Sequence, residues 1–310
     1  MVDPATEFEE QRPRLLRLAY RMLGSLTEAE DVVQEAYVRL HQALADGVEV
    51  GSPAAYLTTI TTRLAIDELR SARARRERYV GPWLPEPILT DRVPDVAEQA
   101  EMAESLSIAF LVVLETLSPV ERAVLLLHDV FGFGHREIAG IVEKSVQNVR
   151  QIAARARKHV EARRPRFEAS KQERDELARR FFEAAGEGDL DALIELLAAD
   201  AVMYGDGGGK VPAVREPVRG ARDVARFLVG LMRLATRQGM TLRLSQVNGE
   251  LGAIAFDAGG RVNTVLSLEL SDGRVRAVRS ILNPDKLHHL EGSMRGRRDT
   301  PTSTTGSRPR

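Results

Sequence analysis

The chain has 310 residues, of which 43% are hydrophobic and none is cysteine, and its formal net charge is −1. This length suggests about two domains, and the composition fits folded domains rather than a largely disordered chain. The absence of cysteine excludes disulfides, thiolate chemistry and cysteine-ligated metal sites. We find neither a signal peptide nor a membrane-spanning stretch in the sequence, and therefore expect a cytoplasmic protein without membrane contact.

The near-neutral net charge conceals a segregated distribution. Residues 1–49 carry −5, residues 81–110 carry −5 and residues 167–200 carry −6, whereas residues 50–80 carry +3 and residues 145–166 carry +6. Segregation of this kind indicates segments with different partners, and the two basic segments suit contact with nucleic acid.

Three helices are predicted within residues 8–80 from apolar residues at helical spacing. Thr27 is predicted to be the N-cap of the second helix, because acidic residues follow it directly. The third helix is predicted to begin at Pro53, since proline is favoured in the first helical turn. Arginines, threonines and Tyr56 along this third helix suit contact with separated DNA strands, although a solvated helix end explains them equally well.

A proline-rich segment follows the three helices. The run from Gly81 to Pro87, with Pro94 further on, cannot form a regular helix and is predicted to be an extended linker. Trp83, the single tryptophan of the chain, stands in this run. Because a large ring in a linker usually packs on something, we expect Trp83 to anchor against a neighbouring domain.

A helix-turn-helix is predicted next. Ser118-Pro119-Val120-Glu121 forms a capping box, and a short helix over residues 135–142 is followed by a brief turn and a basic helix from Ser145. The polar residues on that last helix point away from its apolar stripe: Gln147, Asn148, Arg150, Gln151, Arg155 and Arg157. Such side chains pair with base edges and phosphates, so we expect this helix to bind DNA.

An α+β domain is predicted from residue 170 to residue 290. Two helices are followed by a strand, another helix and four strands joined by hairpin turns at Asn248-Gly249, Gly259-Gly260 and Asp272-Gly273. We expect helices packed on an antiparallel sheet. The tail, residues 291–310, is rich in small and polar residues and is predicted to be disordered.

Residues 8–166 resemble an extracytoplasmic-function (ECF) sigma factor of bacterial RNA polymerase. The resemblance rests on Ala29-Glu30-Asp31-Val32-Val33-Gln34-Glu35-Ala36-Tyr37-Val38-Arg39, on Ala55-Tyr56-Leu57-Thr58-Thr59-Ile60, and on Leu117-Ser118-Pro119-Val120-Glu121-Arg122 with Glu137-Ile138-Ala139 and Arg155-Ala156-Arg157. It implies two all-α sigma domains, at residues 1–80 and 107–166, joined by a linker at residues 81–106. The second sigma domain holds the helix-turn-helix.

The resemblance also implies partners and contact residues. Core RNA polymerase, through the clamp of its largest subunit, would be bound by Asp31, Gln34, Glu35 and Arg39. The −10 element of promoter DNA would be bound by Tyr56, Thr59, Thr62, Arg63 and Arg70. The −35 element would be bound by Ser145, Gln147, Asn148, Arg150, Gln151 and Arg155.

Three positions depart from the family pattern. Arg63 stands where an asparagine is usual, Tyr56 stands where a tryptophan is usual, and the helix-turn-helix turn is Glu143-Lys144 without its common glycine. Because glycine favours a left-handed backbone, the turn is predicted to be slightly strained. The promoter preference is therefore not predicted.

Residues 167–290 resemble a SnoaL-like cone, an α+β fold with a curved antiparallel sheet. Three segments resemble those of ECF factors that carry this extension: Trp83-Leu84-Pro85-Glu86-Pro87, Asp206-Gly207-Gly208-Gly209-Lys210 and Asn283-Pro284-Asp285-Lys286-Leu287. The resemblance implies that the cone modulates the sigma domains in cis. We expect the last two segments to touch the sigma domains or the linker.

Other functions are also considered. A ligand-sensing helix-turn-helix regulator, or a DNA-binding module fused to a small isomerase or cyclase, would share these elements. Asp206, Asp257 and Glu269 are the candidate bases, and His288-His289 is the candidate metal pair. Turn, strand and surface positions explain all of these residues without chemistry, so we predict no catalytic residue, metal or cofactor and leave a small ligand of the cone open.

Overall fold

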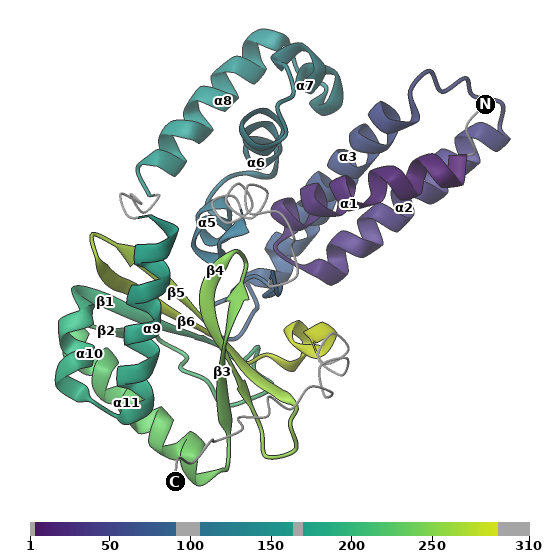
Figure 1. The fold of residues 1–310 in the computed structure, drawn as a ribbon. Coiled ribbons are helices and arrows are strands. Elements are labelled where there is room, and N and C mark those ends of the chain that lie inside the picture. The colour runs from purple at the N-terminus through teal and green to yellow at the C-terminus, as the bar shows by residue number, and fades with distance from the viewer. Residues whose placement is uncertain (1–3, 91–105, 164–169, 291–310) are drawn as a thin grey trace, which may run out of the picture.

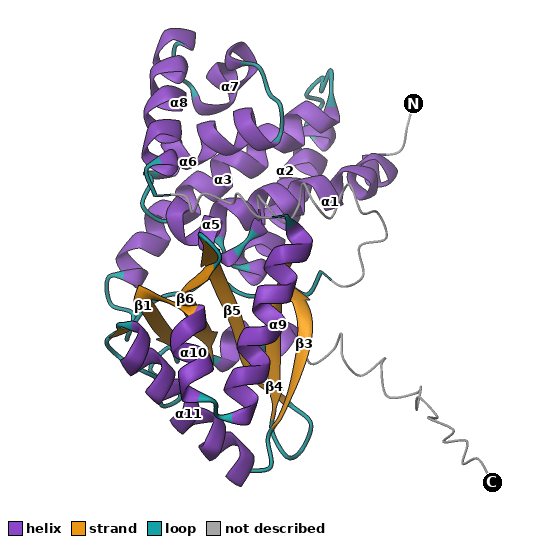
Figure 2. Cartoon of the chain, turned by 60° about the vertical axis from the view of Figure 1, so that its left-hand side comes forward, coloured by secondary structure: helices purple, strands orange, loops and turns teal. Residues whose placement is uncertain are grey.

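The computed structural model describes residues 4–90, 106–163 and 170–290, so Pro94 and the tail predicted to be disordered lie outside the described residues. Two helical groups lie side by side above an α+β domain (Figure 1; Figure 2). None of the helices in the described part of the chain has the length and apolar character that crossing a membrane requires.

The first helical group contains α1 (Pro4–Leu23), α2 (Leu26–Ala45) and α3 (Pro53–Arg76), each of which packs on the other two. The predicted N-cap of α2 is wrong: Ser25, not Thr27, caps the helix, because the Ser25 hydroxyl accepts the hydrogen bond of the Glu28 amide at 3.2 Å. Gly24, at φ +69°, separates α1 from α2.

The second group contains α5 (Ile108–Leu114), α6 (Pro119–Leu125), a π-helical turn (Leu126–Val130), α7 (His135–Val142) and α8 (Val146–Glu161). The predicted capping box at Ser118 and Glu121 is present, as is the helix-turn-helix formed by α7 and α8. The two helical groups share one continuous hydrophobic core, and α3 contacts both α6 and α7.

The α+β domain contains α9 (Lys171–Glu187), α10 (Leu190–Leu196), β1 (Leu197–Asp206), β2 (Val218–Arg219), α11 (Ala221–Arg237), β3 (Thr241–Val247), β4 (Glu250–Phe256), β5 (Val262–Ser271), β6 (Arg274–Ile281) and a 3-10 turn (Pro284–Lys286). The strand order is β2-β1-β6-β5-β4-β3. All neighbours are antiparallel except β1 and β6, which are parallel. The sheet is therefore mostly, not wholly, antiparallel, and the short strand β2 was not predicted.

The two faces of the sheet have different neighbours. One face packs on α9, α10 and α11 through an apolar core that includes Phe181, Leu228 and Leu266. Ile254 and Val265, which pair across β4 and β5, lie on the opposite face with Leu84 of the linker. The cone is thus attached to the rest of the chain through the sheet face that its own helices leave open.

Candidate functional site

Helix α8 presents a polar surface. Its apolar residues are buried, whereas Gln147, Asn148, Arg150, Gln151 and Arg155 are all exposed. The Ser145 hydroxyl accepts the amide hydrogen bond of Asn148 at 3.2 Å and caps the helix. The residues predicted to bind the −35 element therefore lie together on one open face.

The predicted −10 residues on α3 do not all lie on one surface. Thr62 is fully buried in this arrangement, and its hydroxyl donates to the Thr58 carbonyl at 2.7 Å, so it does not lie on the surface with the other predicted residues. Tyr56 is half-buried against the shared core, and Thr59 donates to the Ala55 carbonyl. Arg70 is exposed and pairs with Asp67 of its own helix. The hydroxyl of a threonine in a helix can donate a hydrogen bond to the carbonyl four residues earlier, and it is then not available for a contact at the surface.

Arg63 crosses from α3 to the helix-turn-helix. Its Nε donates to the carbonyl of Ile141 at 2.9 Å and its Nη2 to the carbonyl of Gly140 at 3.1 Å. Its Nη1 lies 3.0 Å from a carboxylate oxygen of Glu143. Arg63 thus satisfies the last carbonyls of α7, a favourable position for a cation at a helix C-terminus.

The face of α2 predicted to bind polymerase is open. Asp31, Gln34, Glu35 and Arg39 are exposed, and Arg39 pairs with Glu35 one turn away at 2.8 Å. Among the described residues of the cone and the linker, none forms a hydrogen bond or an ion pair with these four side chains. This face is accessible in the arrangement described.

Asp206 lies at the centre of a buried contact between the cone and the linker. Its carboxylate accepts hydrogen bonds from the Tyr79 hydroxyl at 2.6 Å, the Leu84 amide at 2.8 Å and the Lys286 ammonium at 2.7 Å. Asp206 is fully buried, and burial lowers the pKa of Lys286, a shift that the Asp206 carboxylate opposes. We call Tyr79, Trp83, Leu84, Asp206 and Lys286 the linker junction.

Two cations contact the indole of Trp83. The Arg76 guanidinium is 3.6 Å from the centre of one ring of Trp83, and the Lys286 ammonium is 4.2 Å from its ring centre. Gly24 makes room for the indole, because a Cβ at Gly24 would lie 2.9 Å from a ring carbon. Cation–π contacts of this kind strengthen when they are shielded from water.

The two remaining predicted segments meet beside the linker junction. The Asn283 side chain donates to the Tyr79 hydroxyl at 2.8 Å, and Lys210 pairs with Asp285 at 2.5 Å on the surface. Gly208 must lack a side chain, because its Cβ would lie 2.4 Å from the Asn283 amide nitrogen. In the structure, residues 206–210, residues 283–287 and the linker therefore lie next to one another and share hydrogen bonds and ion pairs.

Glu86 of the linker reaches the start of α2. Its carboxylate accepts hydrogen bonds from the Ser25 hydroxyl at 2.7 Å and from the amides of Leu26 at 2.7 Å and Thr27 at 3.3 Å. A carboxylate at a helix N-terminus satisfies free amides and complements the helix dipole. The linker is thus tied to the helix that presents the acidic face.

Asn248, in the turn between β3 and β4, was predicted only as a hairpin residue. It is fully buried, and its side chain donates to the Tyr20 hydroxyl at 2.7 Å and to the Leu106 carbonyl at 3.0 Å, while accepting from the Ile88 amide at 3.0 Å. One side chain of the cone therefore bonds to α1, to the linker and to the start of the second helical group. Asn248 has φ +52°, a conformation in which tight hairpin turns favour asparagine. The hairpin alone therefore accounts for this residue, and the sequence does not reveal its contacts with the rest of the chain.

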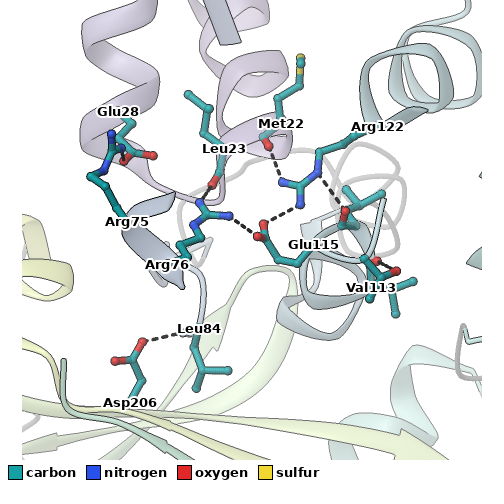
Figure 3. Close-up of polar contacts among 12 residues, drawn as sticks. Met22, Leu23, Glu28, Arg75, Arg76, Leu84, Val113, Glu115, Arg122 and Asp206 are labelled. Carbon is teal, nitrogen blue, oxygen red and sulfur yellow. Dashed lines mark hydrogen bonds and ion pairs between the residues drawn. The ribbon is translucent and has the colours of Figure 1, made fainter. Parts of the chain in front are cut away.

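A partly buried ionic cluster joins the two helical groups (Figure 3). Arg122 is 2% exposed and donates to the carbonyls of Met22 and Leu114 and to the carboxylate of Glu115. Arg76 pairs with the same carboxylate and donates to the Leu23 carbonyl at 2.7 Å. Burial lowers the pKa of Arg122, and Glu115 opposes that shift. The sequence placed Arg76 in the basic run that suits DNA and Arg122 in a family motif, and it did not predict that either joins the two helical groups.

The candidate catalytic carboxylates are all engaged structurally. Asp206 is saturated by donors, Asp257 accepts the amides of Gly259 and Arg261 within its own turn, and Glu269 pairs with Arg279. His289 meets the Pro87 carbonyl at 2.8 Å. Among the described residues, no three acidic or histidine side chains converge as they would around a metal ion.

Comparison with known families divides the chain into three parts. Residues 8–75 match the model of Sigma-70 region 2, residues 107–160 match Sigma-70 region 4, and residues 178–293 match the SnoaL-like domain.

Known proteins match over nearly the whole chain. The ECF RNA polymerase sigma factor SigJ of Mycobacterium tuberculosis is 38% identical and covers 96% of both chains. The probable ECF RNA polymerase sigma factor SigI of the same species is 29% identical over 95% of this chain and 98% of its own. The crystal structure of the M. tuberculosis SigJ superimposes with a TM-score of 0.72 at 36% identity, covering 92% of this chain and 98% of that one.

Proposed function

The chain belongs to the ECF RNA polymerase sigma factors, and from this premise we propose that its cone regulates it in cis by holding the two sigma domains together. A sigma factor binds RNA polymerase and directs it to promoter DNA. The two relatives, which are named as sigma factors, align with this chain over nearly their full length. This match favours a sigma factor over a ligand-sensing regulator or a fused isomerase or cyclase.

We assign the polymerase and promoter contacts to helices α2, α3 and α8. In this proposal, residues 1–80 form the domain that docks on the polymerase clamp through Asp31, Gln34, Glu35 and Arg39. The same domain reads the −10 element through α3, with Tyr56, Thr59, Arg63 and Arg70, and with Thr62, which is buried in the present arrangement. Residues 107–166 read the −35 element through α8, and residues 167–290 regulate. The open polar face of α8 and the open acidic face of α2 support these roles.

The arrangement of α3 and α7 is incompatible with a promoter. The −10 and −35 elements lie about 25 base pairs apart, which is roughly 85 Å of B-form DNA. Here Arg63 of α3 lies within hydrogen-bond distance of α7, the first helix of the helix-turn-helix. The two DNA-reading helices must separate by tens of ångströms before both elements can be bound. We call the present arrangement the closed arrangement.

The observation that carries the regulatory proposal is the linker junction. The linker that must extend when the sigma domains separate is held by a buried ion pair, by hydrogen bonds to Leu84 and by the cations around Trp83. Asn248 and Glu86 fix the same linker to the cone and to α2. Tethering makes such contacts effective, because the local concentration across a short linker is about millimolar.

The test is reconstituted transcription with core polymerase, on a promoter selected from random DNA by the complete holoenzyme. Asp206→Asn and the milder Tyr79→Phe weaken the linker junction, whereas Lys210→Gln removes the exposed ion pair between the same two segments. We expect the first two to raise promoter-specific transcript several-fold and Lys210→Gln to leave it unchanged. Unchanged or reduced transcript from folded Tyr79→Phe protein would contradict regulation through the junction.

A further inference from the structure

Two side chains from the two sigma domains meet in the closed arrangement. Arg63 lies on α3, and Glu143 is the residue that ends α7. In the structure the guanidinium of Arg63 lies 3.0 Å from the carboxylate of Glu143. Neither domain needs this pairing for its own fold, because the two residues belong to different domains and lie 80 positions apart.

The backbone at Glu143 is unusual for its residue type. It ends α7 at φ 54° and ψ 50°, the left-handed conformation for which glycine is favoured. Glutamate therefore stands at a position where its backbone is disfavoured, and its exposed carboxylate contacts α3. The turn itself does not favour glutamate at position 143, whereas the ion pair with Arg63 of the other domain does.

The acceptors that Arg63 contacts in the protein can be replaced by similar acceptors on nucleic acid. The side chains of Arg63 and Glu143 are 40% and 73% exposed, so water and other ligands reach them. The acceptors are two neighbouring carbonyl oxygens and one carboxylate. Nucleic acid offers acceptors of the same chemistry, because guanine presents O6 and N7 side by side and each phosphate carries anionic oxygens.

We propose that the helix-turn-helix turn occupies Arg63 in the closed arrangement, and that Arg63 passes to the promoter strand when the domains separate. Arg63 is then a specificity-determining residue that favours paired acceptors, from guanine or from a phosphate, at its position in the −10 region. Glu143 sets how strongly the turn competes with the DNA. This inference rests on the proposed function, since it assumes that α3 reads the −10 element.

The experiment measures holoenzyme affinity for −10 DNA and transcript yield with full-length Arg63→Gln and Glu143→Gln. Glu161→Gln is the matched control, because it removes one exposed acidic charge from α8 without touching α3. We expect Glu143→Gln to raise both readouts several-fold and Glu161→Gln to change neither. Arg63→Gln should lower affinity by about 5-fold to 150-fold, the usual range for losing a bidentate contact.

Modified DNA identifies the acceptor. Replacing guanines of the −10 strand by 7-deazaguanine removes N7, and replacing single phosphates by methylphosphonate removes an anionic oxygen. One of the two should weaken binding of the unmodified protein and have no effect on Arg63→Gln. If Arg63→Gln instead raises affinity as Glu143→Gln does, or if neither modification acts through Arg63, the specificity role is overturned. Tyr79→Phe still reports separately on control by the cone.

Discussion

Two cationic contacts maintain the closed arrangement, and they differ in their environment. In the linker junction the side chains of Asp206 and Lys286 are 0% and 7% exposed and every oxygen of the carboxylate has a donor. At the edge between α3 and α7, Arg63 and Glu143 remain largely open to solvent. Breaking a buried pair leaves an uncompensated charge, whereas an exposed pair is replaced by water at little cost.

We therefore propose different roles for the two contacts. The linker junction is costly to disrupt and fixes the cone to the linker, whereas in the proposed switch the exposed Arg63 contact is exchanged for a contact with DNA. The cluster of Arg122, Arg76 and Glu115, in which only Arg122 is fully buried, adds hydrogen bonds to the C-terminus of α1. If burial determines how much each contact contributes, substitutions at the buried contacts should cost more stability than substitutions at the exposed ones.

The largest effect is expected for Asp206→Asn. The substitution leaves the buried Lys286 ammonium without a counter-charge, so the free energy of unfolding should fall by about 3–5 kcal/mol. Urea unfolding monitored by Trp83 fluorescence measures it, since that ring lies in the junction. A loss below about 1 kcal/mol would mean that the junction behaves like a surface contact.

A smaller effect is expected at Glu250, a half-buried carboxyl without the full set of donors that Asp206 has. Burial raises its pKa from 4.5 to about 7, against the opposing charges of Arg174 and Arg279. The native state then binds the proton more tightly than the unfolded state, so the contribution of Glu250 to stability is largest below pH 4.5 and is lost as the pH rises through about 7. The loss is at most about 3 kcal/mol.

Glu250→Gln should flatten this dependence, giving a higher melting temperature than the unmodified chain at pH 8 and little difference at pH 4.5. Thermal unfolding across this pH range measures it. Parallel curves for the two proteins would show that Glu250 does not carry the raised pKa.

Glu86→Gln comes next. It keeps the shape of the side chain but replaces charge-assisted bonds to the start of α2 by neutral ones, so we expect a loss of about 1–2 kcal/mol. Urea unfolding again measures it, with Glu77→Gln as a control at an exposed position. An unchanged midpoint would mean that the carboxylate charge contributes nothing at this helix end.

The smallest effect is expected for Lys210→Gln. Lys210 and Asp285 join the same two segments as Asp206 and Lys286, but their side chains are 53% and 62% exposed. The expected loss in urea unfolding is below about 1 kcal/mol. A loss as large as that of Asp206→Asn would remove burial as the explanation for the difference between the two pairs.

Much of this organisation could be predicted from local sequence signals. Capping boxes, hairpin turns and apolar periodicity predicted the helix-turn-helix and most strands, and unusual motifs marked the segments that meet at the linker. The N-cap prediction failed because two neighbouring residues can each cap the same helix. Ser25 and Thr27 are both good caps, and the choice of Ser25 depends on Glu86, 61 residues away in sequence.

The long-range contacts were the part that sequence could not supply. Arg76, Arg122 and Asn248 are ordinary helix and turn residues by local criteria, and their partners are carbonyl groups that every residue possesses. The meeting of Arg63 with Glu143 was equally hidden, although each had been noticed as a departure. Backbone acceptors leave no trace in composition or spacing, so only the fold identifies them.

In our proposal the sigma domains are closed in the free chain and separate on a promoter. Because the chain has no cysteine, Asp67→Cys on α3 and Ala154→Cys on α8 give a clean pair of spin labels at exposed positions. A distance measurement on the free chain should give one population under about 40 Å, twice the radius of gyration of roughly 20 Å for a compact chain of this length. With core polymerase and promoter DNA, the distance should increase by tens of ångströms towards about 85 Å. The same distance in both states would contradict the account.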